Sequence, residues 1–259
     1  MRIKRDADAP ATVQAKKQRP VRVAVQTQAR AQAEACVDEY FDRFRNHNER
    51  NGTNARGGGT QTVTDATIMQ SLRELCSLKG PAAGAVLHRF LVAYGVVRTF
   101  AGLGKLDEPD KYKRLAPLAA RLIAIHKASR GIHPEDVAAV MAACVKERFG
   151  TNASFSSKFL NMLGRPVPIY SSECTAYLHH FGYLQTKSPE YPTFYAAWLK
   201  AFDESTTFSD VRADFTAAAR CRLGQHAVTK ALEEELGAEW FAMRGFDVLH
   251  MKVGGPLRK

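Results

Sequence analysis

Lys158 is the residue of this sequence best suited to covalent chemistry, because it is a single lysine inside an apolar segment that is predicted to be helical. Phe155, Phe159 and Leu160 lie close to it in the sequence. Burial disfavours the charged form of an amine, and a neutral amine is a nucleophile that can form a Schiff base. The alternative is a surface lysine whose stem lies along apolar neighbours while its ammonium stays in water.

A turn with two prolines follows the lysine and determines which residues face it. Pro166 and Pro168 each fix φ and push the preceding residue into extended geometry. The chain must therefore leave the helix after Gly164 and present Tyr170 and Ser171 at a defined angle.

The segments Ser157–Leu160 and Pro168–Ser172 resemble the lysine-to-aspartate block of the 8-oxoguanine DNA glycosylase group, within the helix-hairpin-helix glycosylase superfamily. Residues 240–255 are similar, more weakly, to the closing helix of several glycosylase-like bacterial proteins. In the family the lysine is the nucleophile and the aspartate is its carboxylate partner. The resemblance therefore implies that Lys158 attacks C1′ of a deoxyribose and displaces a modified or damaged base, leaving an imine.

Ser171 stands at the position of the family's aspartate, and this departure leaves three alternatives. A carboxylate stabilises the cationic sugar as the base departs, whereas a hydroxyl offers only a dipole. Glu173 can take over this role, although two residues along a helix rotate a side chain by about 200°, onto a different face. Asp247 can reach the lysine through folding. Otherwise the chain has kept a DNA-binding scaffold and abandoned catalysis.

The residues before the lysine are candidates for contacts with the DNA backbone. The superfamily has a Gly-Val-Gly-like turn here whose amides grip a phosphate, and this sequence has only Gly150 followed by small polar residues. Asn152 tolerates left-handed geometry, and a helix that starts near Ser154 points its amides at an anion. Ser157 and Arg165 complete the expected DNA-binding residues.

A pocket for an extruded purine needs aromatic or apolar walls. Phe155, Tyr170 and Trp240 are the candidates, together with Trp198 and Phe246. The alternative for each of them is an ordinary place in the hydrophobic core.

The charge favours a nucleic-acid partner. The chain has 259 residues with a formal net charge of +11, and an excess of this size favours phosphate backbones or anionic membrane surfaces. Residues 1–22 are rich in basic residues and show no apolar periodicity, so they are predicted to form a flexible basic arm. Residues 23–259 are expected to form a single domain, with a mobile loop near residues 50–63.

Several classes of protein are excluded by what the sequence lacks. Its five cysteines include no Cys-x-x-Cys pair, which argues against a disulfide framework, a zinc site and a four-cysteine iron–sulfur loop. We expect no metal and no cofactor. No apolar run approaches the ~20 residues that cross a bilayer, and the first residues lack a secretory signal. We therefore expect no membrane partner and a cytoplasmic location, at the nucleoid if the protein binds DNA.

The periodicity of apolar residues predicts an all-α fold, because no alternating pattern is sustained anywhere in the chain. The resemblance adds a many-helix, two-lobed globule with a cleft between the lobes. The predicted helices cover residues 23–47, 64–79, 83–99, 111–128, 133–149, 154–163, 172–181, 191–202, 209–223 and 227–251.

The sequence thus predicts a protein that binds double-stranded DNA, resembles base-excision glycosylases and removes an altered base through a Schiff base on Lys158. One rival is a catalytically inactive DNA-binding or scaffold protein of the same fold. Another is a helical adaptor between proteins, which would show negligible affinity for DNA and no steep dependence on salt.

Overall fold

The computed structural model describes residues 65–128, 134–204, 236, 240, 243, 244, 246, 247, 250, 251 and 254–258. The predicted basic arm at residues 1–22, the helices at 23–47 and 209–223 and the mobile loop near 50–63 lie outside the described residues. Of the predicted helix at 227–251, eight residues are described and all eight are helical, namely 236, 240, 243, 244, 246, 247, 250 and 251. We call these eight residues, together with residues 254–258, the C-terminal segment.

The prediction of an all-α fold is confirmed for the described part of the chain, which contains helices and no strand. Seven α-helices and three short 3-10 helices follow one another in the order α2 (Asp65–Leu75), α3 (Gly80–Ala93), η1 (Val97–Thr99), η2 (Leu103–Lys105), α4 (Glu108–Ala128), α5 (Pro134–Lys146), α6 (Ala153–Met162), α7 (Ser172–His180), α8 (Tyr191–Glu204) and η3 (Pro256–Arg258).

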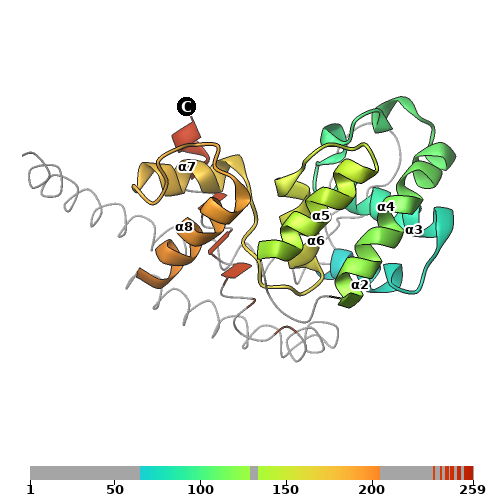
Figure 1. Cartoon of the computed structure of the whole chain (residues 1–259), viewed down its shortest axis with the longest axis horizontal. Helices are drawn as coiled ribbons and strands as arrows, with labels where there is room; N and C mark the ends of the chain where they lie inside the picture. The colour runs from blue at the N-terminus through green and yellow to red at the C-terminus, as the bar shows by residue number, and fades with distance from the viewer. Residues whose placement is uncertain are drawn as a thin grey trace, which may run out of the picture.

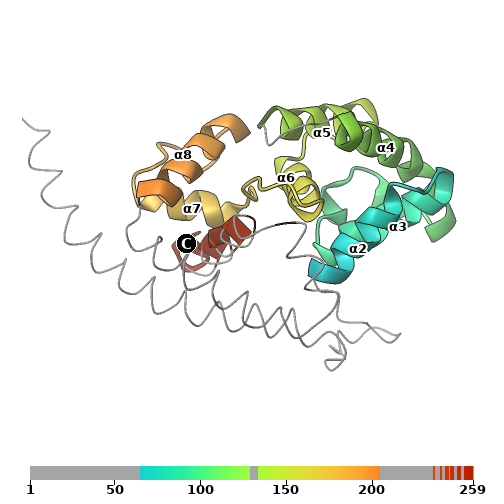
Figure 2. The same cartoon turned by 90° about the horizontal axis from the view of Figure 1, so that it is seen from below.

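Helix α6 lies between two groups of helices (Figures 1 and 2). Helices α2, α3, α4 and α5 gather on one side of it, and α7, α8 and the C-terminal segment gather on the other. Helix α6 packs against α2 and α5, α7 packs against α8 and η3, and α5 also touches α8. The lysine-bearing helix is therefore central to the fold.

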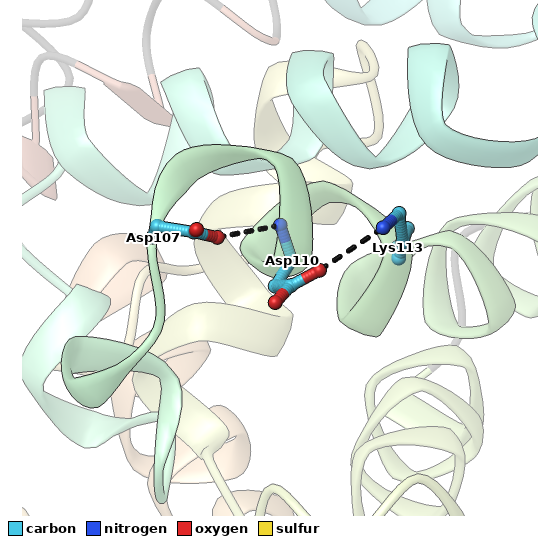
Figure 3. A network of polar contacts seen from close by, with 3 residues as sticks. All are labelled: Asp107, Asp110 and Lys113. Carbon is cyan, nitrogen blue, oxygen red and sulfur yellow. Dashed lines mark hydrogen bonds and ion pairs between the residues drawn. The ribbon is translucent and has the colours of Figure 1, made fainter.

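Helix α4 begins where an aspartate caps it. The predicted helix at 111–128 in fact begins at Glu108, because the Asp107 carboxylate accepts a hydrogen bond from the Asp110 backbone N–H at 3.1 Å (Figure 3). Asp110 in turn pairs with Lys113 one turn later, at 3.1 Å. A side-chain acceptor at a helix start satisfies an amide that has no partner within the helix.

Two predicted helices end earlier than the sequence pattern suggests. The helix predicted over 83–99 is broken, because α3 ends at Ala93 and Gly95 adopts a left-handed backbone with φ of 64° before η1. Helix α2 ends at Leu75, so Cys76 lies outside it and is only half-buried. In both places the apolar spacing continues in the sequence, although the backbone leaves the helix at a turn.

Helix α5 lies within the predicted helix at 133–149 and ends at Lys146, three residues before the predicted end. Val137, Val140 and Cys144 are fully buried, whereas Val145 is 49% exposed. Val145 lies eight residues after Val137, at the edge of the helical face, and just before the chain turns at the left-handed Arg148. The side of α5 that carries Val145 therefore has no helix covering it among the described residues.

Helices α3 and α4 approach each other closely at Gly84. A Cβ atom added there would lie 1.9 Å from the backbone carbonyl oxygen of Tyr112. No real contact is this short, so only glycine fits between the two helices at this point.

We expect Gly84→Ala to destabilise the protein by about 1–3 kcal/mol, because the two backbones must separate to admit the methyl group. Alanine normally favours a helix over glycine, so a loss of stability isolates the packing effect. Gly104→Ala is the matched control, since a Cβ there meets nothing within 4 Å. Urea denaturation followed by circular dichroism measures both changes, and a Gly84→Ala variant as stable as the wild type would contradict the packing.

Candidate functional site

Asn152 caps the helix that carries the lysine. Its side-chain oxygen accepts a hydrogen bond from the Phe155 backbone N–H at 2.9 Å, and its Nδ2 donates to the Thr99 hydroxyl. The side-chain amide is buried, and both its oxygen and its nitrogen form hydrogen bonds. Asn152, predicted to contact DNA, instead fixes the start of α6 against η1. Ser154 lies in the first turn and is half-buried.

Lys158 lies in the middle of α6 and is partly buried. Its Nζ lies 5.7 Å from the centre of the Tyr94 ring, at the end of α3. Burial lowers the pKa of the Lys158 amine below its ordinary value, and the nearby Arg244 guanidinium lowers this pKa further, while Glu173 and Cys174 raise it. The combination favours a larger uncharged fraction than a surface lysine has.

Hydrogen bonds hold the proline turn against α6. The Ser157 hydroxyl accepts from the Tyr170 backbone N–H at 2.9 Å and donates to the Ala153 carbonyl at 2.8 Å. Asn161 Nδ2 donates to the Val167 carbonyl at 2.9 Å. Ser157 is fully buried, so it joins the turn to the helix and does not face a DNA backbone.

Ser171 is the N-cap of α7. Its hydroxyl accepts a hydrogen bond from the Cys174 backbone N–H at 3.1 Å, and its backbone is extended, with φ of −145° and ψ of 159°. The hydroxyl is therefore engaged in capping and lies at the edge of the buried region.

Glu173 is the carboxylate whose charge acts on Lys158. It lies in the first turn of α7, is half-buried and raises the pKa of the lysine. The 200° rotation expected between Ser171 and Glu173 does not apply, because Ser171 is extended and lies outside the helix. Ser172 Oγ donates to Glu173 Oε2 at 3.2 Å.

Asp247 joins three elements from the interior of the protein. It is fully buried and accepts hydrogen bonds from the Ile169 backbone N–H at 3.3 Å and from Trp198 Nε1 on α8 at 3.1 Å. Burial raises the pKa of Asp247 to about 7, while Arg244 and the two hydrogen bonds lower it. Asp247 is not among the groups that shift the pKa of Lys158, but it interacts with Arg244 and Cys174, which are among them.

The C-terminal segment contacts α6, α7 and α8 through residues spaced along one helical face. Trp240 Nε1 donates to the Asn161 carbonyl at 2.9 Å, and the His250 ring lies 4.1 Å from the Tyr177 ring on α7. A Cβ on Gly254 would lie 2.0 Å from the Glu173 carbonyl oxygen. The segment therefore lies directly against the start of α7, where Glu173 is.

Four of the five aromatic residues predicted to form a base pocket are core residues. Phe155 is fully buried in a cluster with the rings of Phe90, Phe100 and Phe159. Trp198, Trp240 and Phe246 are also buried. None of these four rings is available to an extruded base in this conformation.

Tyr170 is the fifth candidate and is only partly buried. Its hydroxyl donates to the Pro189 carbonyl at 3.0 Å and its ring contacts Phe194 on α8. It is thus the aromatic candidate whose side chain is still partly exposed to solvent. Arg165, also half-buried, donates through Nη2 to the His126 carbonyl at 3.4 Å.

Arg244 is the residue of this site that the sequence reasoning missed. It is 8% exposed and acts electrostatically on Lys158, Cys174 and Asp247. A signal was available, because Trp240, Arg244 and Asp247 have the i, i+4, i+7 spacing of one helix face. Tyr94 and Cys174 also surround the amine, and both escaped the sequence pattern because they belong to other elements.

Comparisons with protein families, with characterised proteins and with solved structures found no match to this chain. Within the described ranges, no cluster of histidine, cysteine and acidic residues is arranged to hold a metal ion. In the same part of the chain, no helix combines the length and apolar character needed to span a bilayer.

Replacing Asp247 with asparagine tests the raised pKa. A carboxyl whose folded pKa of about 7 exceeds its unfolded value of about 4 binds more protons when folded, so its contribution to stability is lost as pH rises through this window. The stability of Asp247→Asn relative to the wild type should therefore increase between pH 4 and 7, by at most about 1.4 kcal/mol per pH unit, and level off above that.

Urea denaturation at a series of pH values measures this difference. His250, whose pKa burial lowers to about 3, destabilises both proteins alike as pH falls below about 6.5, so its effect cancels. Asp247→Ala is the control, because it strands the Ile169 and Trp198 donors and should cost about 1–3 kcal/mol for each of them. A flat difference between Asp247→Asn and wild type would mean that the carboxyl titrates normally.

Proposed function

We propose that this protein binds double-stranded DNA and removes a modified or damaged base with Lys158 as the nucleophile, as its resemblance to the 8-oxoguanine DNA glycosylase group implies. One observation carries the proposal. The amine of Lys158 has a lowered pKa and lies within the field of the Glu173 carboxylate, on the other side of a turn that hydrogen bonds fix.

The reaction balances with groups that lie in this site. The Lys158 nitrogen bonds to C1′ and loses a proton, while the C1′–N bond to the base breaks and the base leaves with the electron pair and takes up a proton. The nitrogen lone pair then opens the sugar ring: the C1′–O4′ bond breaks, O4′ keeps the electron pair and takes up the proton that the nitrogen releases, and a C1′=N imine forms. Loss of a proton from C2′ expels the 3′ phosphate by β-elimination.

Glu173 supplies the negative charge that the family places at the position of Ser171. As the base departs, positive charge develops on the sugar, and a fixed carboxylate in a partly dry site stabilises it more than a hydroxyl dipole can. The Glu173 carboxylate can also accept the proton that the amine loses when it attacks.

The charge of the whole chain supports a DNA partner. A net +11 attracts the phosphate backbone and releases its counterions. The base must also leave the stack, which costs a few kcal/mol and favours lesions that pair poorly. Tyr170, partly exposed beside the turn, is the aromatic surface best placed for the extruded base.

A second candidate function is a DNA-binding scaffold without catalysis, and the state of Ser171 favours it. Its hydroxyl caps α7, so the residue at the family's aspartate position serves the helix and has no charge to offer. In this alternative Lys158 contacts a phosphate and forms no covalent bond.

Borohydride trapping tests the nucleophile. Wild-type protein, incubated with a panel of lesion-bearing duplexes and sodium borohydride, should form a covalent adduct that Lys158→Ala abolishes, because reduction of the imine links the amine to the sugar. Lys146→Ala is the matched control, since Lys146 is exposed at the end of α5, and it should trap as the wild type does. No adduct across the panel, or undiminished trapping by Lys158→Ala, would end the proposal.

Ser171→Asp distinguishes an active glycosylase from a DNA-binding scaffold that has lost catalysis. Aspartate caps helices as well as serine does, so α7 should stay intact while a second carboxylate comes close to the turn. If the wild type is inactive and Ser171→Asp removes bases, as measured by single-turnover release from a lesion duplex, the scaffold alternative is supported. Ser171→Asn keeps the cap without the charge and should not gain activity; turnover by the wild type would eliminate this alternative.

A further inference from the structure

Arg244 lies in the described C-terminal segment with two anchors on its own helical face. Trp240, four residues earlier, donates to the Asn161 carbonyl at 2.9 Å, one turn after Lys158 on α6. Asp247, three residues later, accepts from the Ile169 backbone N–H in the turn that leads to Ser171. Residues three and four apart are neighbours on a helix, so both anchors fix where the arginine lies.

These anchors place Arg244 between the end of α6 and the start of α7, the two elements that carry Lys158 and Glu173. The side chain is almost fully buried. Its guanidinium stays charged at every accessible pH, so it is a permanent cation at a fixed place in the interior of the protein.

Among the described residues, four groups contact or act electrostatically on the Lys158 amine, and two of these four are charged near neutral pH. Tyr94 presents a ring, and burial raises the pKa of the Cys174 thiol so that it stays protonated. Glu173 from α7 and Arg244 from the C-terminal segment act with opposite signs. The carboxylate alone would hold the amine in its protonated, unreactive form, and the guanidinium opposes that effect.

We propose that Arg244, held beside Lys158 by the Trp240 and Asp247 anchors, is a positioning residue that makes the amine available as a nucleophile. The inference rests on the proposed role of Lys158 and adds the group that controls the protonation of its amine. Glu173 and Arg244 then have different roles: the carboxylate stabilises the cation that forms on the sugar, and the guanidinium disfavours protonation of the amine before the reaction.

Direct titration of the amine tests this inference without DNA. Lysines are methylated reductively with ¹³C-formaldehyde, the Lys158 signal is identified by its loss in Lys158→Arg, and its chemical shift is followed with pH. Arg244→Met should shift the midpoint of Lys158 upward, whereas Arg244→Lys, which keeps the charge, should leave it close to the wild type. Arg89→Met removes an equal charge from an exposed position on α3 and should shift nothing.

Reactivity should follow the same shift. At pH 7, borohydride trapping by Arg244→Met should fall and should recover as pH is raised, while Arg244→Lys should keep the wild-type pH profile. An arginine that only stabilised the fold would lower trapping equally at every pH. An unshifted Lys158 midpoint in a folded Arg244→Met variant would overturn the inference.

The titration stays decisive if Arg244→Met does not fold. Arg244→Gln removes the same charge in a shorter polar side chain. Should neither fold, Trp240→Phe removes the anchoring hydrogen bond to the Asn161 carbonyl and loosens the position of Arg244, so the Lys158 midpoint should move upward; no movement would overturn the inference. If the wild type forms no adduct with any lesion, the proposed reaction fails, yet the titration still decides whether Arg244 controls the amine.

Discussion

The site depends on one buried interaction, the acceptance of two hydrogen bonds by the Asp247 carboxylate in the interior of the protein. Its donors come from the proline turn and from α8, so a single side chain joins these two elements to the C-terminal segment. Removing a buried carboxylate that accepts hydrogen bonds destabilises the protein, because each buried donor that is left without an acceptor costs its full desolvation penalty. This interaction therefore determines where the segment lies and, with it, where Arg244 lies.

A consequence of this arrangement is a set of opposing charges around a partly buried amine. Glu173 from α7 and Arg244 from the C-terminal segment act with opposite signs on Lys158 of α6, while Asp247, whose pKa burial raises to about 7, interacts with Arg244. In a site of low polarity such charges act on one another far more strongly than on a surface. The protonation of Lys158 is thus a property of three separate parts of the chain and not of its own helix alone.

The sequence predicted the elements better than it predicted their contacts. Apolar periodicity correctly gave an all-α fold for the described part of the chain, because burial of a helical face is a local signal. It failed at Gly95, where a left-handed turn breaks a continuous apolar pattern. Lys158 and Glu173 were recognisable as residues, but Arg244 was not, since its proximity to the lysine arises from the docking of a segment some 80 residues away.

Under the proposed function, the capping of α7 explains how a serine can stand where the 8-oxoguanine DNA glycosylase group has an aspartate. An aspartate at an N-cap does two things, since it accepts a backbone N–H and carries a negative charge. Ser171 performs only the first, with a hydrogen bond from the Cys174 backbone N–H at 3.1 Å. Glu173, two residues further on in the first turn of α7, is the carboxylate whose charge acts on Lys158. Two residues thus carry the two roles, so a serine at position 171 does not by itself remove the electrostatic partner that the proposal gives to Lys158.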